Sequence, residues 1–195
     1  MSHCRRVWVF LLIVFLLGGC GAKVPHQIAP EYAKRGVRLL AVLPVENETA
    51  NPTAAGMLRA KLVEELHFKG YPRIPLKMID DALAGAAPLG GGRITPQRFG
   101  QLVKVDAVLY ATLKEAQMGS GVLFGRTLVD AEFELRSVRT GESLWQVRYR
   151  TSHHHFGFSR RNIELKASQV YEEAVQEVVG KVLSTLPDAD EAPAT

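Results

Sequence analysis

The fold is decided by the stretch VDAVLYATLK at residues 105–114, in which apolar and polar side chains alternate. The same alternation recurs in VDAEFELR at 129–136 and in WQVRYRT at 145–151. A period of two with one charged face is typical of antiparallel strands that are covered on one side only. Thr140-Gly141-Glu142 favours a hairpin turn between the last two strands. We expect a glycine-containing loop from Met118 to Gly125 between the first two.

On the C-terminal side of these strands, the sequence predicts one long helix. Apolar residues recur at three- and four-residue spacing from Ile163 to Val182 and form a stripe along one helix face. Pro187 ends this pattern. Residues 187–195 are acidic and rich in alanine and proline, so we expect a disordered tail.

On the N-terminal side, the apolar run VRLLAVL at residues 37–43 is typical of a strand buried on both faces. A helix is expected next, since Asn51 and Pro52 suit its first positions. Leucines spaced by four then give it an apolar stripe, and Gly70 suits its end.

Three shorter elements are predicted between that helix and the alternating strands. Residues 71–76 suggest a second strand, which two prolines place near a sheet edge. Short helices are expected at 77–84 and 95–104. The predicted order is β-α-β-α-α-β-β-β-α, in a single domain at residues 37–186. We therefore expect an α/β (α+β) fold, a mixed sheet with helices packed on one main face.

The N-terminus has the layout of a bacterial export signal. Two arginines precede an apolar run from Val7 to Leu17, which is too short to span a bilayer as a stable helix. The run ends in Leu17-Gly18-Gly19-Cys20, which resembles the lipobox of bacterial lipoproteins. The resemblance implies that residues 1–19 are removed and that Cys20 carries a diacylglycerol thioether. The alternative is an ordinary secretory signal with a chance cysteine at its cleavage site.

Removal of the signal lowers the formal net charge from +4 to +2, because Arg5 and Arg6 leave with it. A nearly neutral chain gives no basis for a nucleic-acid partner. The two cysteines of the sequence are Cys4, in the signal, and Cys20, which would be lipidated. No thiol pair then remains for a disulfide or a cysteine-based metal site.

The segment after the lipobox indicates how the domain is held. Residues 20–36 contain two prolines and scattered polar side chains, so we expect the lipidated cysteine followed by a tether. In diderm bacteria, an aspartate after the lipidated cysteine retains a lipoprotein at the inner membrane. Gly21 stands at that position, which predicts the outer membrane.

Three segments resemble known families. VLPVENET at residues 42–49 resembles the strand and turn that open the TolB amino-terminal domain, the curli-secretion lipoprotein CsgG and the peptidoglycan-synthase activator LpoB. ELHFKGYP at 65–72 and VDAVLY at 105–110 are similar to a periplasmic lipoprotein family of unknown function known from a neisserial surface antigen. The resemblance covers residues 38–186. It implies a TolB-like and CsgG-like fold and an envelope secretion or transport assembly, and it carries over no catalytic residue.

Several polar clusters are weaker candidates for a site. His153-His154-His155 contains good metal ligands, but neighbouring strand residues point to opposite faces, which favours a solvated loop. Glu46-Asn47-Glu48-Thr49 follows a buried strand but lacks the glycines that wrap a phosphate. Asp80-Asp81 and Glu172-Glu173 favour solvated helix faces over acid–base pairs. We expect no catalytic residue, no metal site and no cofactor.

One apolar group is a candidate partner surface. Val122, Leu123 and Phe124 lie between two glycines, and an apolar loop tip often marks a contact with another protein. The alternative is that these side chains fold back over the sheet.

The sequence therefore predicts a binding or assembly component rather than an enzyme. It would be anchored to the outer membrane through the lipid on Cys20, with its domain facing the periplasm and contacting envelope proteins or further copies of itself. An accessory regulator of a cell-wall synthase is the alternative binding function. An enzyme of unrecognised type is the alternative from another class.

Overall fold

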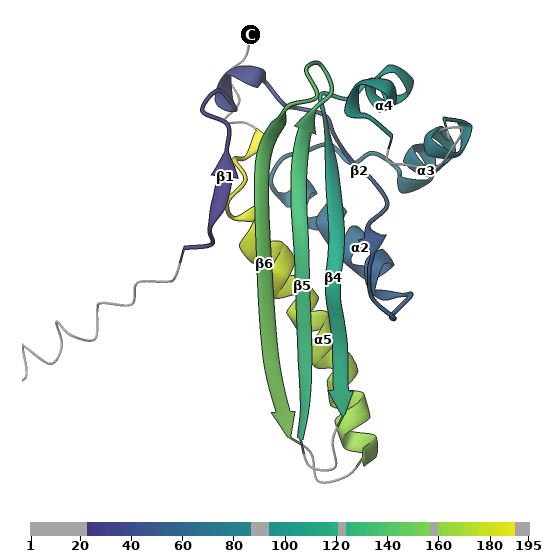
Figure 1. Cartoon of the computed structure of the whole chain (residues 1–195), viewed down its shortest axis with the longest axis vertical. Helices are drawn as coiled ribbons and strands as arrows, with labels where there is room; N and C mark the ends of the chain where they lie inside the picture. The colour runs from purple at the N-terminus through teal and green to yellow at the C-terminus, as the bar shows by residue number, and fades with distance from the viewer. Residues whose placement is uncertain (1–22, 87–93, 121–123, 157–159, 190–195) are drawn as a thin grey trace, which may run out of the picture.

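The computed structural model describes residues 23–86, 94–120, 124–156 and 160–189. The chain forms a mixed six-stranded sheet with helices packed against it (Figure 1). The strands are β1 (His26–Ile28), β2 (Leu40–Val42), β3 (Glu46–Asn47), β4 (Ala107–Ser120), β5 (Phe124–Ser137) and β6 (Ser143–Phe156). The helices are the short 3-10 helix η1 (Ala33–Arg35) and the α-helices α2 (Ala54–Phe68), α3 (Leu76–Gly85), α4 (Pro96–Val103) and α5 (Arg160–Leu183).

The three alternating stretches form the centre of the sheet, as predicted. The strand order is β1-β6-β5-β4-β2, and β3 also pairs with β4. Pairing is antiparallel between β4, β5, β6 and β1, and parallel between β4 and both β2 and β3. The predicted hairpin turn is also confirmed, and Gly141 takes the positive φ of 76° that such a turn favours.

The long strands extend further than the sequence predicted. The expected loop from Met118 to Gly125 is wrong at both ends, because Ser120 pairs with Gly125 and Phe124 pairs with Phe156. Cross-strand hydrogen bonding outweighs the local turn preference of the glycines there. We call residues 115–120, 124–130 and 150–156 the arm, and Figure 1 shows α5 running along it.

One core lies between the sheet and the helices α2 and α5. The predicted stripe of Leu58, Leu62 and Leu66 is buried there, together with Phe133 and Trp145 from the sheet. This confirms the mixed α/β fold with its main helices on one face.

A second, smaller core lies on the opposite face, at the β2 end of the sheet. Ile79 of α3 and Phe99 of α4 pack against Leu43, Val108 and Tyr110. The expectation of helices on one main face therefore holds for α2 and α5 only. The strand residues 40–43 and 107–111, which are covered on both faces, are called the covered corner below.

The sequence placed α4 correctly, and its contacts explain why it stays close to the sheet. The Thr95 hydroxyl accepts a hydrogen bond from the backbone N–H of Arg98, which caps the helix. A Cβ on Gly100 would lie 1.9 Å from Cγ1 of Val138, so only glycine allows this approach to the β5–β6 turn.

Two local predictions are wrong. Residues 71–75 are not a strand but a connection between α2 and α3, because Pro72 and Pro75 cannot donate to a ladder. Helix α2 begins at Ala54, two residues later than Pro52 suggested, although the Asn51 side chain does accept a hydrogen bond from the backbone N–H of Thr53, as a capping residue can.

The expected tether at residues 20–36 does not hold for its described part. Val24 and Tyr32 are buried, and β1 lies between them as an edge strand on β6. At the other end, the Pro187 carbonyl accepts a hydrogen bond from the Tyr71 hydroxyl, and the Ala189 N–H donates to the Lys69 carbonyl. The first residues of the expected tail are therefore bound to the segment that follows α2. The remaining tail residues lie outside the described part of the chain.

Within the described ranges, no helix combines the length and the apolar character that crossing a membrane requires.

Candidate functional site

The sheet face opposite α5 carries a network of paired charges. Arg148 lies 3.0 Å from Glu132, and Arg150 lies 2.7 Å from Glu115. Lys114, at the irregularity in β4, lies 3.7 Å from Glu132 and 2.7 Å from Glu48. The hydrogen bond to Glu48 is the main reason that the pKa of Lys114 is raised. Positive and negative charges are interleaved here, so the face does not present one dominant sign.

Asp130 is the buried member of this network. Its side chain is 2% exposed, whereas that of Arg148 is 57% exposed. Nε of Arg148 donates to Oδ1 at 3.0 Å and Nη2 donates to Oδ2 at 2.8 Å, which is a two-pronged pair. The hydrogen bond to Asp130 is the first cause of the raised pKa of Arg148. This pair holds the guanidinium in one orientation over the sheet.

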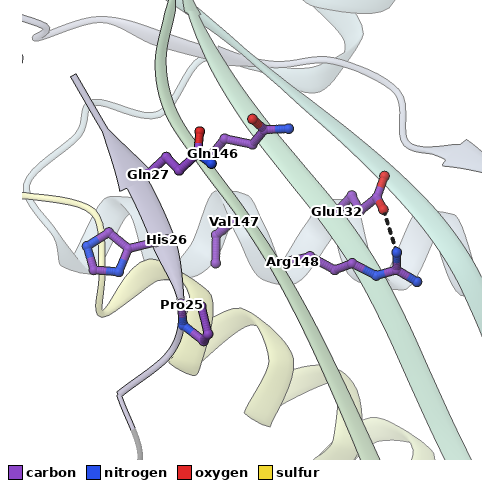
Figure 2. Close-up of a pocket in the computed structure, with 7 residues that line it drawn as sticks. All are labelled: Pro25, His26, Gln27, Glu132, Gln146, Val147 and Arg148. Carbon is purple, nitrogen blue, oxygen red and sulfur yellow. Dashed lines mark ion pairs between the residues drawn. The ribbon is translucent and has the colours of Figure 1, made fainter.

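Beside Arg148 the surface is hollowed, with a volume of about 410 Å³. Figure 2 shows β1 on one side of the hollow and the Arg148–Glu132 ion pair on the other. Its lining residues are Pro25, His26, Gln27, Glu132, Gln146, Val147 and Arg148.

The lining of this hollow contains groups that can bind a polar ligand. It contains the guanidinium of Arg148, the carboxylate of Glu132 and two glutamine amides. Together these groups can hydrogen-bond a zwitterionic ligand, which carries a positive and a negative charge. None of the lining residues is a serine, threonine or cysteine, so none supplies a hydroxyl or thiol nucleophile.

A second hollow of about 460 Å³ lies between the covered corner and α3. Its lining is mainly apolar, and Glu46 of the predicted polar segment lies at it. Asn47 and Thr49 form a local turn, in which the Asn47 side chain accepts from the backbone N–H of Thr49. Glu46 and Asn47 thus form the short strand β3, and the polar turn that the sequence favoured over a phosphate loop begins at Asn47.

The three histidines lie on β6 rather than in the expected loop. Nε2 of His153 is 2.7 Å from Oε2 of Glu177 on α5. His154 is exposed on the other face, opposite Arg126. The alternation of a strand thus separates these two histidines, as argued from the sequence. In the part of the chain that the structure describes, no group of three or more metal-binding side chains comes together.

Glu177 instead joins α5 to β6. Its carboxylate accepts hydrogen bonds from the hydroxyls of Tyr149 and Thr151, each at 3.0 Å, and contacts His153. Burial alone would raise the pKa of Glu177, but these three hydrogen bonds outweigh it and lower that pKa. Burial and the bond to Glu177 raise the pKa of Tyr149.

Phe124, the described member of the candidate partner surface, lies at the far end of the arm. Val122 and Leu123 fall outside the described residues, as does Cys20. Phe124 begins β5, and its Cα pairs with that of Phe156 in β6. Phe156 is 70% exposed and was missed by the sequence analysis. Counting equal numbers of residues outward from the turn at Thr140 brings these two phenylalanines opposite each other, so the signal was present in the sequence.

The carboxylates of the two predicted acidic pairs either form ion pairs with basic side chains or are exposed to solvent. Asp80 forms an ion pair with the buried Arg59 at 2.8 Å, and Asp81 pairs with Lys77. Glu172 and Glu173 are exposed on α5.

Solved structures with a similar fold include the lipoprotein GNA1162 of Neisseria meningitidis, at 21% identity and a TM-score of 0.55, covering 69% of this chain and 96% of that one. The PelC dodecamer of Paraburkholderia phytofirmans aligns at 19% identity and a TM-score of 0.56, covering 85% and 99%. The LpoB C-terminal domain of Escherichia coli, at 18% identity over 73% of this chain and 93% of that one, reaches a TM-score of only 0.44, too low to carry an argument.

These similarities, all at low identity, establish the fold alone. No protein among curated sequences matches this chain significantly. The family model described as "Putative lipoprotein GNA1162-like" matches residues 31–194. The chain therefore belongs to the GNA1162-like lipoprotein family.

Proposed function

We propose that this protein is a subunit of a cell-envelope assembly, anchored at the outer membrane through lipid on Cys20, with its domain in the periplasm. Membership of a lipoprotein family supports the anchor, together with the sequence Leu17-Gly18-Gly19-Cys20. The binding role rests on the arm, and copies of the same chain are its proposed partners.

The observation that carries this proposal is the apolar end of the arm. Phe156 exposes 70% of its surface, its Cα pairs with that of Phe124, and the apolar residues Val122 and Leu123 precede Phe124 in the sequence. Large exposed apolar side chains that gather at one place mark contact surfaces. Burying one phenylalanine contributes about 1.5–3 kcal/mol before the costs of association.

The arm also has open strand edges. Among the described residues, β4 from Glu115 onward and β6 from Arg150 to His155 pair with a strand on one side only. Such edges present backbone N–H and C=O groups to which another chain can add. The similar PelC structure is a dodecamer, which supports self-association as the mode of assembly proposed here.

Crosslinking in cells tests the arm. Phe156→Asp, and separately Leu123→Asp with Phe124→Asp, should remove crosslinks to other copies while the thermal midpoint of unfolding stays close to that of the parent. The matched control is Phe68→Asp, because Phe68 is equally exposed, at 73%, but lies on α2. This control should keep the crosslinks. An unchanged pattern in the arm variants, or a loss confined to Phe68→Asp, would contradict the proposal.

The anchor is tested independently of the arm. Cys20→Ser should leave an unprocessed or soluble protein, and mass spectrometry should find the diacylglycerol adduct on the parent only. Density-gradient separation of the two membranes should place the mature parent protein in the outer one. A processed Cys20→Ser protein that fractionates with membranes like the parent would show that the lipobox interpretation is wrong.

A further inference from the structure

The folded domain begins only a few residues after the proposed anchor. Val24 is 8% exposed, and β1 starts two residues later. Residues His26 to Ile28 pair with Val147 to Trp145 of β6, and the backbone N–H of Ala29 donates to the carbonyl of Leu144 at 2.8 Å. The chain is thus fixed to the sheet from Val24 onward.

A second set of contacts keeps this segment in place. Tyr32 is buried, and its hydroxyl lies 2.9 Å from that of Tyr71. Tyr71 in turn donates to the carbonyl of Pro187 at 3.0 Å. Burial, followed by the neighbouring Tyr71, raises the pKa of Tyr32, so the pair stays protonated and hydrogen-bonded at neutral pH. The short strand β1 is therefore held in place at both of its ends, by the buried Val24 before it and the buried Tyr32 after it.

The covalent reach from Cys20 to Val24 is small. Four residues of fully extended chain span at most about 14 Å. Adjacent strands lie about 4.8 Å apart, so the distance across the sheet from β1 to β2 is about 19 Å, longer than this reach. A lipid on Cys20 can therefore hold the β1 edge at the membrane surface. If the β2 edge lay at the membrane instead, β1 would be too far away for the chain from Val24 to reach Cys20 in the lipid.

We infer that the β1 edge of the sheet lies against the phospholipid head groups, while β2 and α3 face away from the membrane. This rests on the lipidation of Cys20 proposed above. Figure 1 shows β1 on one side of the sheet and α3 on the other.

The chemistry of the β1 edge fits head groups rather than the hydrocarbon core. Lys23, His26 and Gln27 are exposed there, and the hollow beside them carries Arg148 and Glu132. Guanidinium and ammonium groups suit lipid phosphates, and a carboxylate suits a lipid ammonium group. Because Arg148 and Glu132 already pair with each other, the surface contributes little affinity of its own, and the anchor confines the domain there.

Fluorescence quenching in vesicles tests this orientation. The mature chain holds no cysteine except the modified Cys20, so a single new thiol can be labelled with a fluorophore. Gln27→Cys reports on β1, and Lys77→Cys, also exposed, reports on α3. The full lipidated protein is reconstituted in phosphatidylethanolamine–phosphatidylglycerol vesicles that contain a lipid with a nitroxide on its head group. The label at Gln27 should be quenched several-fold more strongly than the label at Lys77.

A spacer supplies the matched control. Inserting about 20 glycine and serine residues after Gly21 gives a mean reach of about 25 Å, which should remove the difference between the two labels. Equal quenching in the lipidated protein without the spacer, or stronger quenching at Lys77, would overturn the orientation while leaving the anchor intact. A protein whose mass shows no lipid on Cys20 would overturn both proposals.

Discussion

The covered corner and the arm share the strand β4, but the residues of β4 are buried differently in the two regions. In the covered corner, the five successive residues from Ala107 to Ala111 are all buried, because α2 and α5 pack on one face and α3 and α4 on the other. In the arm, α5 covers one face and the other is polar, so Glu115 is only partly buried and Gln117 is exposed. A strand loses its alternation where both faces are covered and keeps it where one is.

Within one sheet, the covered corner therefore contributes mainly to the stability of the fold, and the arm provides the surface for contacts with other molecules. The covered corner contains apolar side chains from two cores, and all of its residues are buried. The arm offers a polar face, two strand edges and an exposed phenylalanine at its end. We expect substitutions in the covered corner to act on folding and substitutions on the outer surface of the arm to act on assembly.

The largest expected effect comes from a matched pair of buried leucines. Leu109 lies in the covered corner and belongs to the α2–α5 core. Leu128 lies in the arm and is equally buried, but it lies outside both apolar clusters. Leu109→Ala should lower the free energy of unfolding by about 3–5 kcal/mol, whereas the cost of Leu128→Ala should fall near 2 kcal/mol, because its surroundings can close over the cavity.

Urea unfolding of the two variants measures this difference. Equal losses would show that the arm is packed as tightly as the covered corner, and the contrast drawn between them would be wrong. A larger loss for Leu128→Ala would place the more rigid packing in the arm.

The sequence predicted the long elements because each repeats its own pattern. Three stretches with period two predict β4, β5 and β6, and the turn at Thr140 sets the register between β5 and β6. The stripe from Ile163 to Val182 predicts α5 in the same way. These patterns arise from burial on one face, which a single sequence records directly.

The elements that were missed depend on distant partners. Strand β1 contains only one apolar residue, Ile28, and it forms because β6, more than a hundred residues away, offers a free edge. Tyr71 was assigned to a strand although its burial serves contacts with Tyr32 and Pro187.

The candidate site was only partly predictable for the same reason. Asp130 looks like any other acid on a polar strand face, and nothing local signals that Arg148 covers it. The hollow beside Arg148 exists because β1 docks on β6, so it was invisible until that pairing was known. Phe156, in contrast, could be placed opposite Phe124 from the turn alone.

The second prediction concerns the charged face where the arm begins. Arg148→Gln leaves the buried carboxylate of Asp130 without its two-pronged partner, whereas Asp130→Asn leaves an exposed guanidinium that water can solvate. An unpaired buried charge is costly, so Arg148→Gln should lower the thermal midpoint of unfolding more than Asp130→Asn does. Both losses should be smaller than that of Leu109→Ala.

A double-mutant cycle of these two substitutions measures the pair directly. If the two single variants and the double variant lose stability additively, Asp130 and Arg148 do not act as a unit and the face is held by its other ion pairs.

The smallest effect is expected where the arm meets α5, at Glu177, and it should depend on pH. The folded protein lowers the pKa of this carboxyl below its usual 4.5, through hydrogen bonds from Tyr149, Thr151 and His153. A lowered pKa stabilises the fold above the unfolded value, and that stabilisation is lost as the pH falls through the lowered value. Glu177→Gln should therefore cost about 1 kcal/mol at neutral pH, and the difference from the parent should shrink below pH 4.5 and disappear once the pH is below the lowered pKa. Glu173→Gln, on the exposed side of the same helix, is the control and should match the parent within about 0.5 kcal/mol at every pH. Urea unfolding across this pH range measures the free energy of unfolding of each variant. If Glu177→Gln remains less stable than the parent in acid, the ionised carboxylate is not what holds α5 to the arm.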